Sequence, residues 1–279
     1  MNITKHEIKN QLAQIEELPT LSLVAQKVIA LTKDPKSSAA DLQKVIKADT
    51  ALTAKVLKIV NSAYYGFPSS ITSISQAIVI LGFKTIRNLA MSVSILENIF
   101  KNARGYEDVW EHSVITAITS QTVAEKFKYI NVEEVFIAGI IHDIGKIILS
   151  TYFPETIDEV LNYSNDNHIT FYEAEKNIMD TNHALIGGWL LKKWEFPQIL
   201  IDAVKYHHTI NKLKENDVIK YVYLGDVVAR LMGYSCGDSI VNTIDFDVWQ
   251  DSGLTISMLR DIINTSKKMI NNAKGFFEV

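Results

Sequence analysis

Five histidines of the chain stand on, or at the end of, segments in which apolar residues recur at helical spacing. They are His112, His142, His183, His207 and His208. His142 is followed by Asp143 within the apolar sequence IAGIIHDIGKIIL, and Asp226 lies in the similarly apolar YLGDVVARL. An ionised carboxylate in such surroundings is costly unless it is paired or bound to a cation. We therefore predict that these acids and histidines lie together around a cation.

Imidazole and carboxylate groups together are a ligand set for borderline divalent ions such as iron, manganese, zinc, nickel or cobalt. The first predicted site has the ligands His112, His142, Asp143 and Asp226. The second predicted site has the ligands His183, His207 and His208, with Asp143 as the bridge. Two ions about 3.5–4 Å apart suit phosphoester hydrolysis, because one activates water while both stabilise phosphoryl oxygens. Lys146 would then steady a phosphate, which makes Asp143 and Lys146 the candidate catalytic residues.

Each of these residues also has an ordinary structural interpretation. A single histidine on an apolar helix is more often a hydrogen-bonded core residue than a metal ligand. Asp226 could pair with Arg230, four residues later, and Lys146 could be a solvated side chain. His207 and His208 could form an exposed helix end. The metal interpretation is favoured because the same coincidence would otherwise have to recur on five helices.

The composition is that of a folded protein with one or two compact units, since 279 residues contain 47% hydrophobic and 22% charged side chains. The net charge of −4, with both signs interspersed, offers no bulk attraction for nucleic acid. The most apolar stretch, Val135 to Ile141, is far shorter than the ~20 residues that span a bilayer. The single cysteine, Cys236, cannot form an internal disulfide. We expect a cytoplasmic protein in a reducing compartment.

Helical spacing dominates the chain, and glycine and proline are few, which predicts an all-α fold. Ser38 and Asp41 have capping-box spacing, Asp49 or Thr50 can cap the next helix, and Tyr65 to Ser70 should be a loop. In the first hundred residues we expect helices over 4–16 and 22–33, from 38, from 49 or 50, and over 73–81 and 85–100.

Longer helices are expected in the remainder of the chain. We place them at about 107–128, 133–151, 155–166, 170–180, 183–194, 197–208, 217–233 and 255–274. The segment 234–253 is less regular and should contain one short helix. We place the junction near 101–106, between an N-terminal helical subdomain over 1–104 and a metal-site subdomain over 105–279.

The order of the predicted ligands resembles a known signature. His112, then His142-Asp143, then Asp226 resembles the H…HD…D signature of the HD hydrolase superfamily. HDIGK, followed by the later histidines, is similar to the HD-GYP branch, which cleaves cyclic di-GMP at a centre of two or three metal ions. In that branch an acid one turn before the first histidine can join the centre, and Asp108 occupies the matching position.

Three further segments carry a second resemblance. They are LPTLSLVAQKVIAL, ADTALTAKVLKIVNSAYYGFPSSITSISQAIVILGFKTIRNLAM and HALIGGWLLKKWEFP. These segments closely resemble the HDOD family, and the resemblance covers about residues 12–210. The resemblance implies a multi-helix, HD-domain-like fold with an N-terminal helical HDOD subdomain. It also implies a role in bacterial signal transduction, often beside diguanylate cyclase or phosphodiesterase domains. Many HDOD proteins have lost ligands and are thought to be non-catalytic.

Two departures from these families shape the expected function. This chain keeps the whole ligand set, which favours one or two bound divalent ions, with iron, manganese, zinc or nickel as the expected metals. After His208 the sequence TINKLKENDVIKY lacks the acidic and GYP loop, which argues against hydrolysis of cyclic di-GMP. We expect a regulatory protein that acts through a signalling partner protein, with the metal in a structural or sensory role.

Two alternatives remain open, and so does the role of one aromatic cluster. The first alternative is a metal-dependent phosphohydrolase, a phosphodiesterase acting on a nucleotide or cyclic dinucleotide. The second is a nucleic-acid-associated regulator, which four local lysines favour and the net charge opposes. These lysines are Lys44, Lys47, Lys55 and Lys58. Tyr64, Tyr65 and Phe67 are either core aromatics or an exposed partner surface.

Overall fold

The structure is a computed structural model that describes residues 8, 21–34, 36–100, 106–236 and 244–273. Every regular element in these residues is an α-helix, and no strand occurs among them, which confirms the predicted all-α class. Within the same residues, no helix combines the length and apolar character needed to cross a bilayer. The predicted helix over 4–16 and the predicted junction after residue 104 fall largely outside the described residues, and the division into two subdomains stays a prediction.

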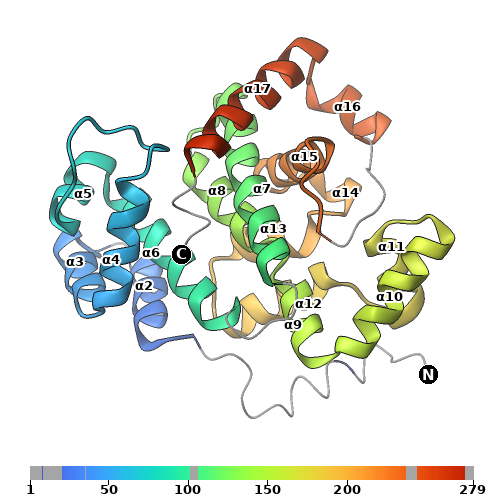
Figure 1. The fold of residues 1–279 in the computed structure, drawn as a ribbon, viewed down its shortest axis with the longest axis horizontal. Helices are drawn as coiled ribbons and strands as arrows, with labels where there is room; N and C mark the ends of the chain where they lie inside the picture. The colour runs from blue at the N-terminus through green and yellow to red at the C-terminus, as the bar shows by residue number, and fades with distance from the viewer. Residues whose placement is uncertain (1–7, 9–20, 35, 101–105, 237–243, 274–279) are drawn as a thin grey trace.

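The helices of the first hundred residues form one side of the molecule (Figure 1). They include α2 (Leu23–Lys33), α3 (Ala39–Lys47), α4 (Thr50–Val60), α5 (Ile74–Leu81) and α6 (Phe83–Phe100). The predicted caps are confirmed, because Ser38 and Asp41 form a capping box and the Asp49 carboxylate accepts from the backbone N–H of Leu52. Helix α6 begins two residues before the predicted start at Thr85.

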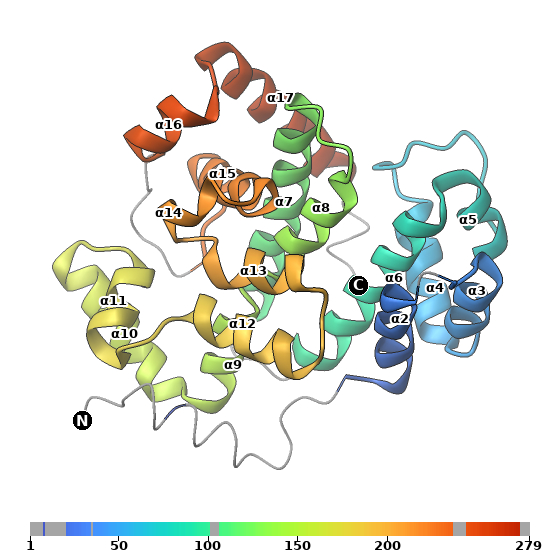
Figure 2. The same ribbon diagram turned by 180° about the vertical axis from the view of Figure 1, so that it is seen from behind.

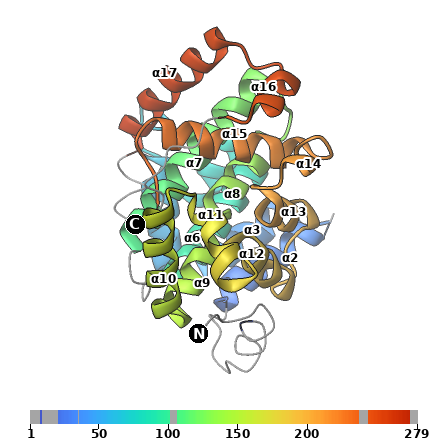
Figure 3. The same cartoon turned by 90° about the vertical axis from the view of Figure 1, so that its right-hand side faces the viewer.

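The remaining helices form the other part of the structure, in which α7 packs against α8 and α15, while α12 packs against α9 and α13 (Figure 2). They are α7 (Tyr106–Lys126), α8 (Val132–Ile141), α9 (Ile144–Tyr152), α10 (Pro154–Asn167), α11 (Phe171–Met179), α12 (His183–Lys193), α13 (Gln198–Tyr206), α14 (Ile210–Leu213), α15 (Asp217–Leu231), α16 (Phe246–Ser252) and α17 (Ile256–Asn272). Helices α16 and α17 lie at one end of the molecule, beyond α15 (Figure 3). The short helix expected within 234–253 is α16, whereas α14 was not predicted.

The predicted continuous helix over 133–151 was wrong, because the chain breaks between α8 and α9. His142 keeps helical dihedral angles, but Asp143 has φ −95° and ψ 13° and turns the chain out of the helix. Gly145 then allows α9 to touch the start of α12, since a Cβ at this position would overlap the carbonyl oxygen of His183. The break therefore directs Asp143 toward the first residue of α12.

Candidate metal centre

The structure brings the sequence-predicted histidines and acids together from separate elements. His112 comes from α7, His183 begins α12, and Asp226 lies on α15. The others are His142 and Asp143 at the α8–α9 break, and His207 and His208 at the end of α13. All are buried, with at most 3% exposure, except His208, which is half-buried. The interpretation of His207 and His208 as an exposed helix end was therefore wrong.

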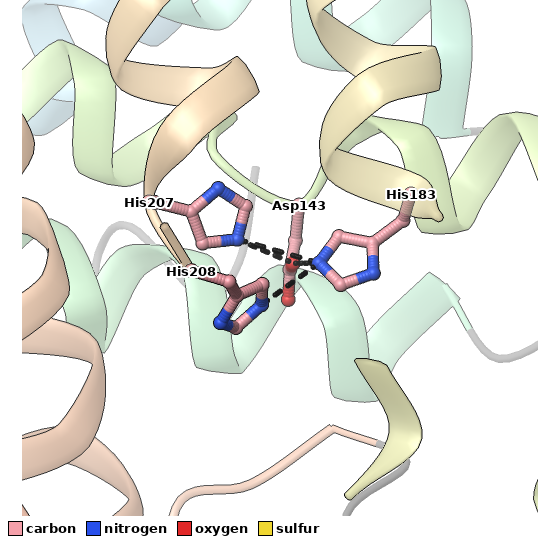
Figure 4. A group of neighbouring side chains, drawn as sticks. All are labelled: Asp143, His183, His207 and His208. Carbon is pink, nitrogen blue, oxygen red and sulfur yellow. Dashed lines mark hydrogen bonds and ion pairs between the residues drawn. The ribbon is translucent and has the colours of Figure 1, made fainter. Parts of the chain in front are cut away.

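One group of potential ligand atoms contains Asp143, His183, His207 and His208, all within 4.8 Å of one another. Figure 4 shows the three imidazoles and the carboxylate pointing toward a common centre. The Nε2 atom of His183 lies 3.1 Å from Nε2 of His208 and 3.3 Å from Nε2 of His207. The same Nε2 lies 3.1 Å from Oδ1 of Asp143. Three nitrogen atoms and one oxygen thus share a space of the size that one cation needs.

A second group contains His112, His142 and Asp143, again within 4.8 Å. It faces the other oxygen of the same carboxylate, because Oδ2 of Asp143 lies 3.5 Å from Nε2 of His112 and 3.4 Å from Nε2 of His142. The two groups therefore share Asp143, with Oδ1 turned to one and Oδ2 to the other. This arrangement would allow Asp143 to bridge two ions, which stays a prediction.

In four of the histidines, the ring nitrogen that faces away from the centre, Nδ1, makes a hydrogen bond to an oxygen atom. The Nδ1 donors and their acceptors are His112 to the Tyr234 carbonyl at 3.0 Å, His142 to the Gly139 carbonyl at 2.7 Å, His207 to the Val204 carbonyl at 2.7 Å, and His183 to Oε2 of Glu175 at 2.6 Å. Because carbonyl oxygens only accept, Nδ1 carries a proton in the rings of His112, His142 and His207, and the Glu175 carboxylate accepts from Nδ1 of His183. A neutral imidazole then presents the lone pair of Nε2, which is how metal-binding histidines are held.

Several of the converging atoms need a cation. Nε2 of His142 and Oδ1 of Asp143 are buried without a well-formed hydrogen bond to any described residue, whereas Oδ2 of Asp143 has the Lys146 ammonium 2.9 Å away. Leaving such groups unpaired costs free energy, and lone pairs that face one another repel. A divalent ion would satisfy them, and the donor set of imidazole and carboxylate fits one. The residues present therefore fit a metal centre.

The charges of the centre follow from burial and from neighbouring groups. Burial raises the pKa of Asp143, but His142, Lys146 and His183 outweigh it and hold that pKa well below its usual range. Burial opposes protonation of His183, yet Glu175 and Asp143 raise its pKa to about 9. Burial lowers the pKa of His207 to about 4. Without a metal, the His183 imidazole is therefore doubly protonated and positively charged at neutral pH, whereas the His207 imidazole is neutral.

Lys146 is turned into the centre. Its ammonium nitrogen lies 2.9 Å from Oδ2 of Asp143 and donates to the carbonyl oxygen of Cys236 at 3.0 Å. The side chain is only 8% exposed, so the interpretation of Lys146 as a solvated lysine was wrong. The segment after α15, which supplies the carbonyls of Tyr234 and Cys236, therefore covers this part of the centre.

Asp226 has two partners, and both were considered from the sequence. Its carboxylate accepts a hydrogen bond from Arg230, and Oδ1 lies 3.2 Å from Nε2 of His112. Burial raises the pKa of Asp226, but Arg230 and His112 hold it well below its usual range. Asp226 thus adjoins the second group without belonging to its cluster of close ligand atoms. Asp108 is exposed and is in neither group.

Glu175 was missed by the sequence analysis. It is fully buried on α11, where Oε1 accepts from the backbone N–H of His183 at 2.9 Å and Oε2 holds Nδ1 of that residue. The signal was its place on the buried face of α11, which also carries Phe171, Ala174 and Ile178. An acid at the helical spacing of a buried face requires a partner. Glu175 orients His183 and satisfies the first N–H of α12.

The fold and the centre define a helical protein with an HD-type cluster of histidine and aspartate. The sequence model of the HDOD domain matches residues 18–210, which is more than half of the chain. The chain therefore belongs to the HDOD domain family.

One curated relative and two solved structures illustrate the likeness. An uncharacterised protein of Treponema pallidum (strain Nichols) is 24% identical over 204 residues, which are 73% of this chain but 39% of the relative. The chain thus spans about two fifths of that protein. An HDOD domain protein of unknown function from Geobacter sulfurreducens has a TM-score of 0.77 at 22% identity, covering 94% of this chain and 91% of that one. A protein named as a candidate signal transduction protein, from Marinobacter aquaeolei VT8, has a TM-score of 0.76 at 22% identity. The match covers 94% of this chain and 60% of that one.

Proposed function

We propose that this HDOD protein is a regulatory protein of signal transduction that holds one or two divalent metal ions around Asp143. The observation that carries the proposal is the convergence of Nε2 atoms on both oxygens of one buried carboxylate. One ion would be held by Asp143, His183, His207 and His208, the ligands of the second site predicted from the sequence. The other ion would be held by His112, His142 and Asp143, with Asp226 beside them. Iron, manganese, zinc or nickel suits these ligands.

The regulatory role is supported by the burial of the centre within the chain's own side chains and backbone. Lys146 is held by Asp143 and the Cys236 carbonyl, and the other side chains of the centre are almost wholly buried except for the half-buried His208. Ions in both groups would offset the charge of Asp143 and together link α7, the α8–α9 break, α12 and the end of α13, since each contributes a ligand. Such a link makes the arrangement of these helices depend on the metal. The change would then be passed to a signalling partner protein.

A second candidate function is a metal-dependent phosphohydrolase acting on a nucleotide or cyclic dinucleotide. The sharing of Asp143 between two ligand groups favours it, because paired ions at a bridging carboxylate suit phosphoester hydrolysis. The bound ions would supply an activated water and stabilise the phosphoryl oxygens. Asp143 would position both ligand groups, and Lys146 would offset phosphate charge after leaving the Cys236 carbonyl.

The experiment measures metal content and turnover in the same preparations. Untagged full-length protein, purified without chelator, is analysed by elemental mass spectrometry beside His183→Ala, His142→Ala and the control His168→Asn. His168 is exposed and has φ 53°, a conformation that Asn tolerates. We expect one or two ions in wild type and control, and a loss in the two variants. Less than about 0.2 ion in the folded wild-type chain would refute the metal centre.

Turnover then separates the two functions. The metal-loaded protein is incubated with a panel of phosphodiesters that includes cyclic dinucleotides. The regulatory proposal expects no turnover above that of His142→Ala. Robust hydrolysis that this substitution abolishes would replace the proposal with the phosphohydrolase function.

A further inference from the structure

A cavity lies away from the metal centre, where α6 meets α7 and α8. Its volume is about 190 Å³, and none of the predicted metal ligands lines it. The side chains that matter for its chemistry are Tyr64, Tyr65, Thr85, Asn88, Glu133 and Phe136. They come from the segment after α4, from α6 and from α8, so the cavity lies between the helices of the first hundred residues and those that carry the metal centre. A ligand here would touch both parts of the fold.

The lining contains polar groups that the described residues leave without a hydrogen bond. Asn88 is only 5% exposed, and its Oδ1 accepts from the Arg87 guanidinium at 3.3 Å. Its amide nitrogen has no such partner in the described part of the chain, nor has the Thr85 hydroxyl or the Glu133 carboxylate. The amide group of the buried Asn88 thus shares the cavity with the carboxylate of the half-buried Glu133. Such groups usually find a partner, which can be protein, water or a ligand.

Three of the nine residues that line the cavity are aromatic. Tyr64 and Tyr65 pack edge to face with ring centroids 5.0 Å apart, and both are half-buried. They are therefore neither full core residues nor an exposed patch. Phe136 lines the cavity from α8 and is buried. Aromatic faces of this kind accept a flat ring.

We infer that this cavity binds a nucleobase, a flat heteroaromatic ring that presents a donor and an acceptor on one edge. The Asn88 amide would donate to a ring nitrogen or carbonyl, while Glu133 would accept from a ring N–H or amino group. Aromatic stacking combined with such edge contacts is the usual way in which proteins hold an unpaired base. The volume is below the range of about 300–1,000 Å³ typical for larger ligands, so a base fits and a whole dinucleotide does not.

Two other classes of ligand match the lining less well. An organic amine would suit Glu133 and the aromatic rings, but it would leave the Asn88 amide facing a second donor. A phosphate group would suit the Asn88 amide, but it would face the Glu133 carboxylate, and no lysine or arginine lines the cavity. Only a ligand with both kinds of group satisfies both ends.

The test measures the binding of small probes to the full-length protein by saturation-transfer NMR and calorimetry. The probes are guanosine, adenosine, cytidine and uridine, with tyramine and inorganic phosphate as the competing classes. We expect at least one nucleoside to bind saturably and neither competitor to bind in the cavity. Asn88→Ala and Glu133→Gln should each weaken that binding about tenfold or more. Glu133 is half-buried, so this second variant should fold even if Asn88→Ala does not.

Matched controls separate the cavity from the rest of the protein. Asn162→Ala and Glu159→Gln change exposed residues of α10 and should leave nucleoside binding unchanged. His183→Ala should also leave it unchanged, because the cavity has no residue in common with the metal centre. The inference is overturned if no nucleoside binds saturably or if tyramine or phosphate binds in the cavity instead. Equal nucleoside affinity of wild type and both cavity variants would also overturn it.

Discussion

Glu175→Gln should weaken metal binding although Glu175 belongs to neither ligand group. The carboxylate accepts two hydrogen bonds from His183, one from the backbone N–H at 2.9 Å and one from Nδ1 at 2.6 Å. A glutamine has a single acceptor oxygen in its side-chain amide. If this oxygen keeps the backbone N–H, the amide NH₂ faces Nδ1 and the ring proton moves to Nε2. That nitrogen lies 3.1 Å from Asp143 and could then no longer bind an ion.

The expected magnitude is a loss of about 10- to 100-fold in metal affinity, as is usual when the partner of a metal-binding histidine is changed. Competition of the metal-free protein against a chromophoric chelator measures this affinity. Glu159→Gln, an exposed change on α10, is the control and should bind as wild type does. Because glutamine has the same shape as glutamate, circular dichroism should show an unchanged helix content. Unaltered affinity in a folded Glu175→Gln protein would refute the positioning role of Glu175.

Three further outcomes follow from the same centre. Since the pKa of His183 is about 9 without metal, an ion must displace its proton below that pH. Metal affinity should therefore rise about tenfold per pH unit between pH 7 and 8, and calorimetry in buffers of different ionisation enthalpy should show proton release. Saturation with an ion at about 100 times its Kd should raise Tm by roughly 5–10 °C relative to protein in excess chelator, and equal melting curves would contradict it. Gly145→Ala should lower the free energy of unfolding by about 1–3 kcal/mol because the new Cβ overlaps the His183 carbonyl; denaturant titration beside Ser150→Ala, on the same helix, checks this.

The sequence predicted those parts of the fold that depend on short-range contacts. The Ser38 capping box and the Asp49 cap each join residues three positions apart, so the interacting groups are visible in the sequence. The break at Asp143 was not visible, because IAGIIHDIGKIIL is apolar on every side and shows no change of period. Packing of α9 on α12, far apart in the sequence, decides where α8 ends. Long-range packing of this kind leaves no local pattern.

For the candidate site, the sequence indicated which residues need a partner but not which partner each residue has. Apolar surroundings indicated that Asp143 and Asp226 needed partners, and both have them. The sequence left open whether Asp226 faces Arg230 or the histidines, and the structure shows contact with both. Glu175 was not predicted as part of the site because its partner, His183, lies eight residues away across a turn. Whether an acid pairs locally or across the fold depends on helix placement, which spacing does not reveal.

The break between α8 and α9 explains how one carboxylate can serve two groups of histidines. In a continuous helix, successive side chains point about 100° apart, so His142 and Asp143 would diverge. At the break, Nε2 of His142 instead lies 3.4 Å from Oδ2 of Asp143, and its ring packs between those of His112 and His207, at 5.2 and 5.0 Å. Oδ1 remains turned toward His183. The irregular backbone at this position is therefore what allows the two ligand groups to share Asp143, and the centre could not form on an uninterrupted helix.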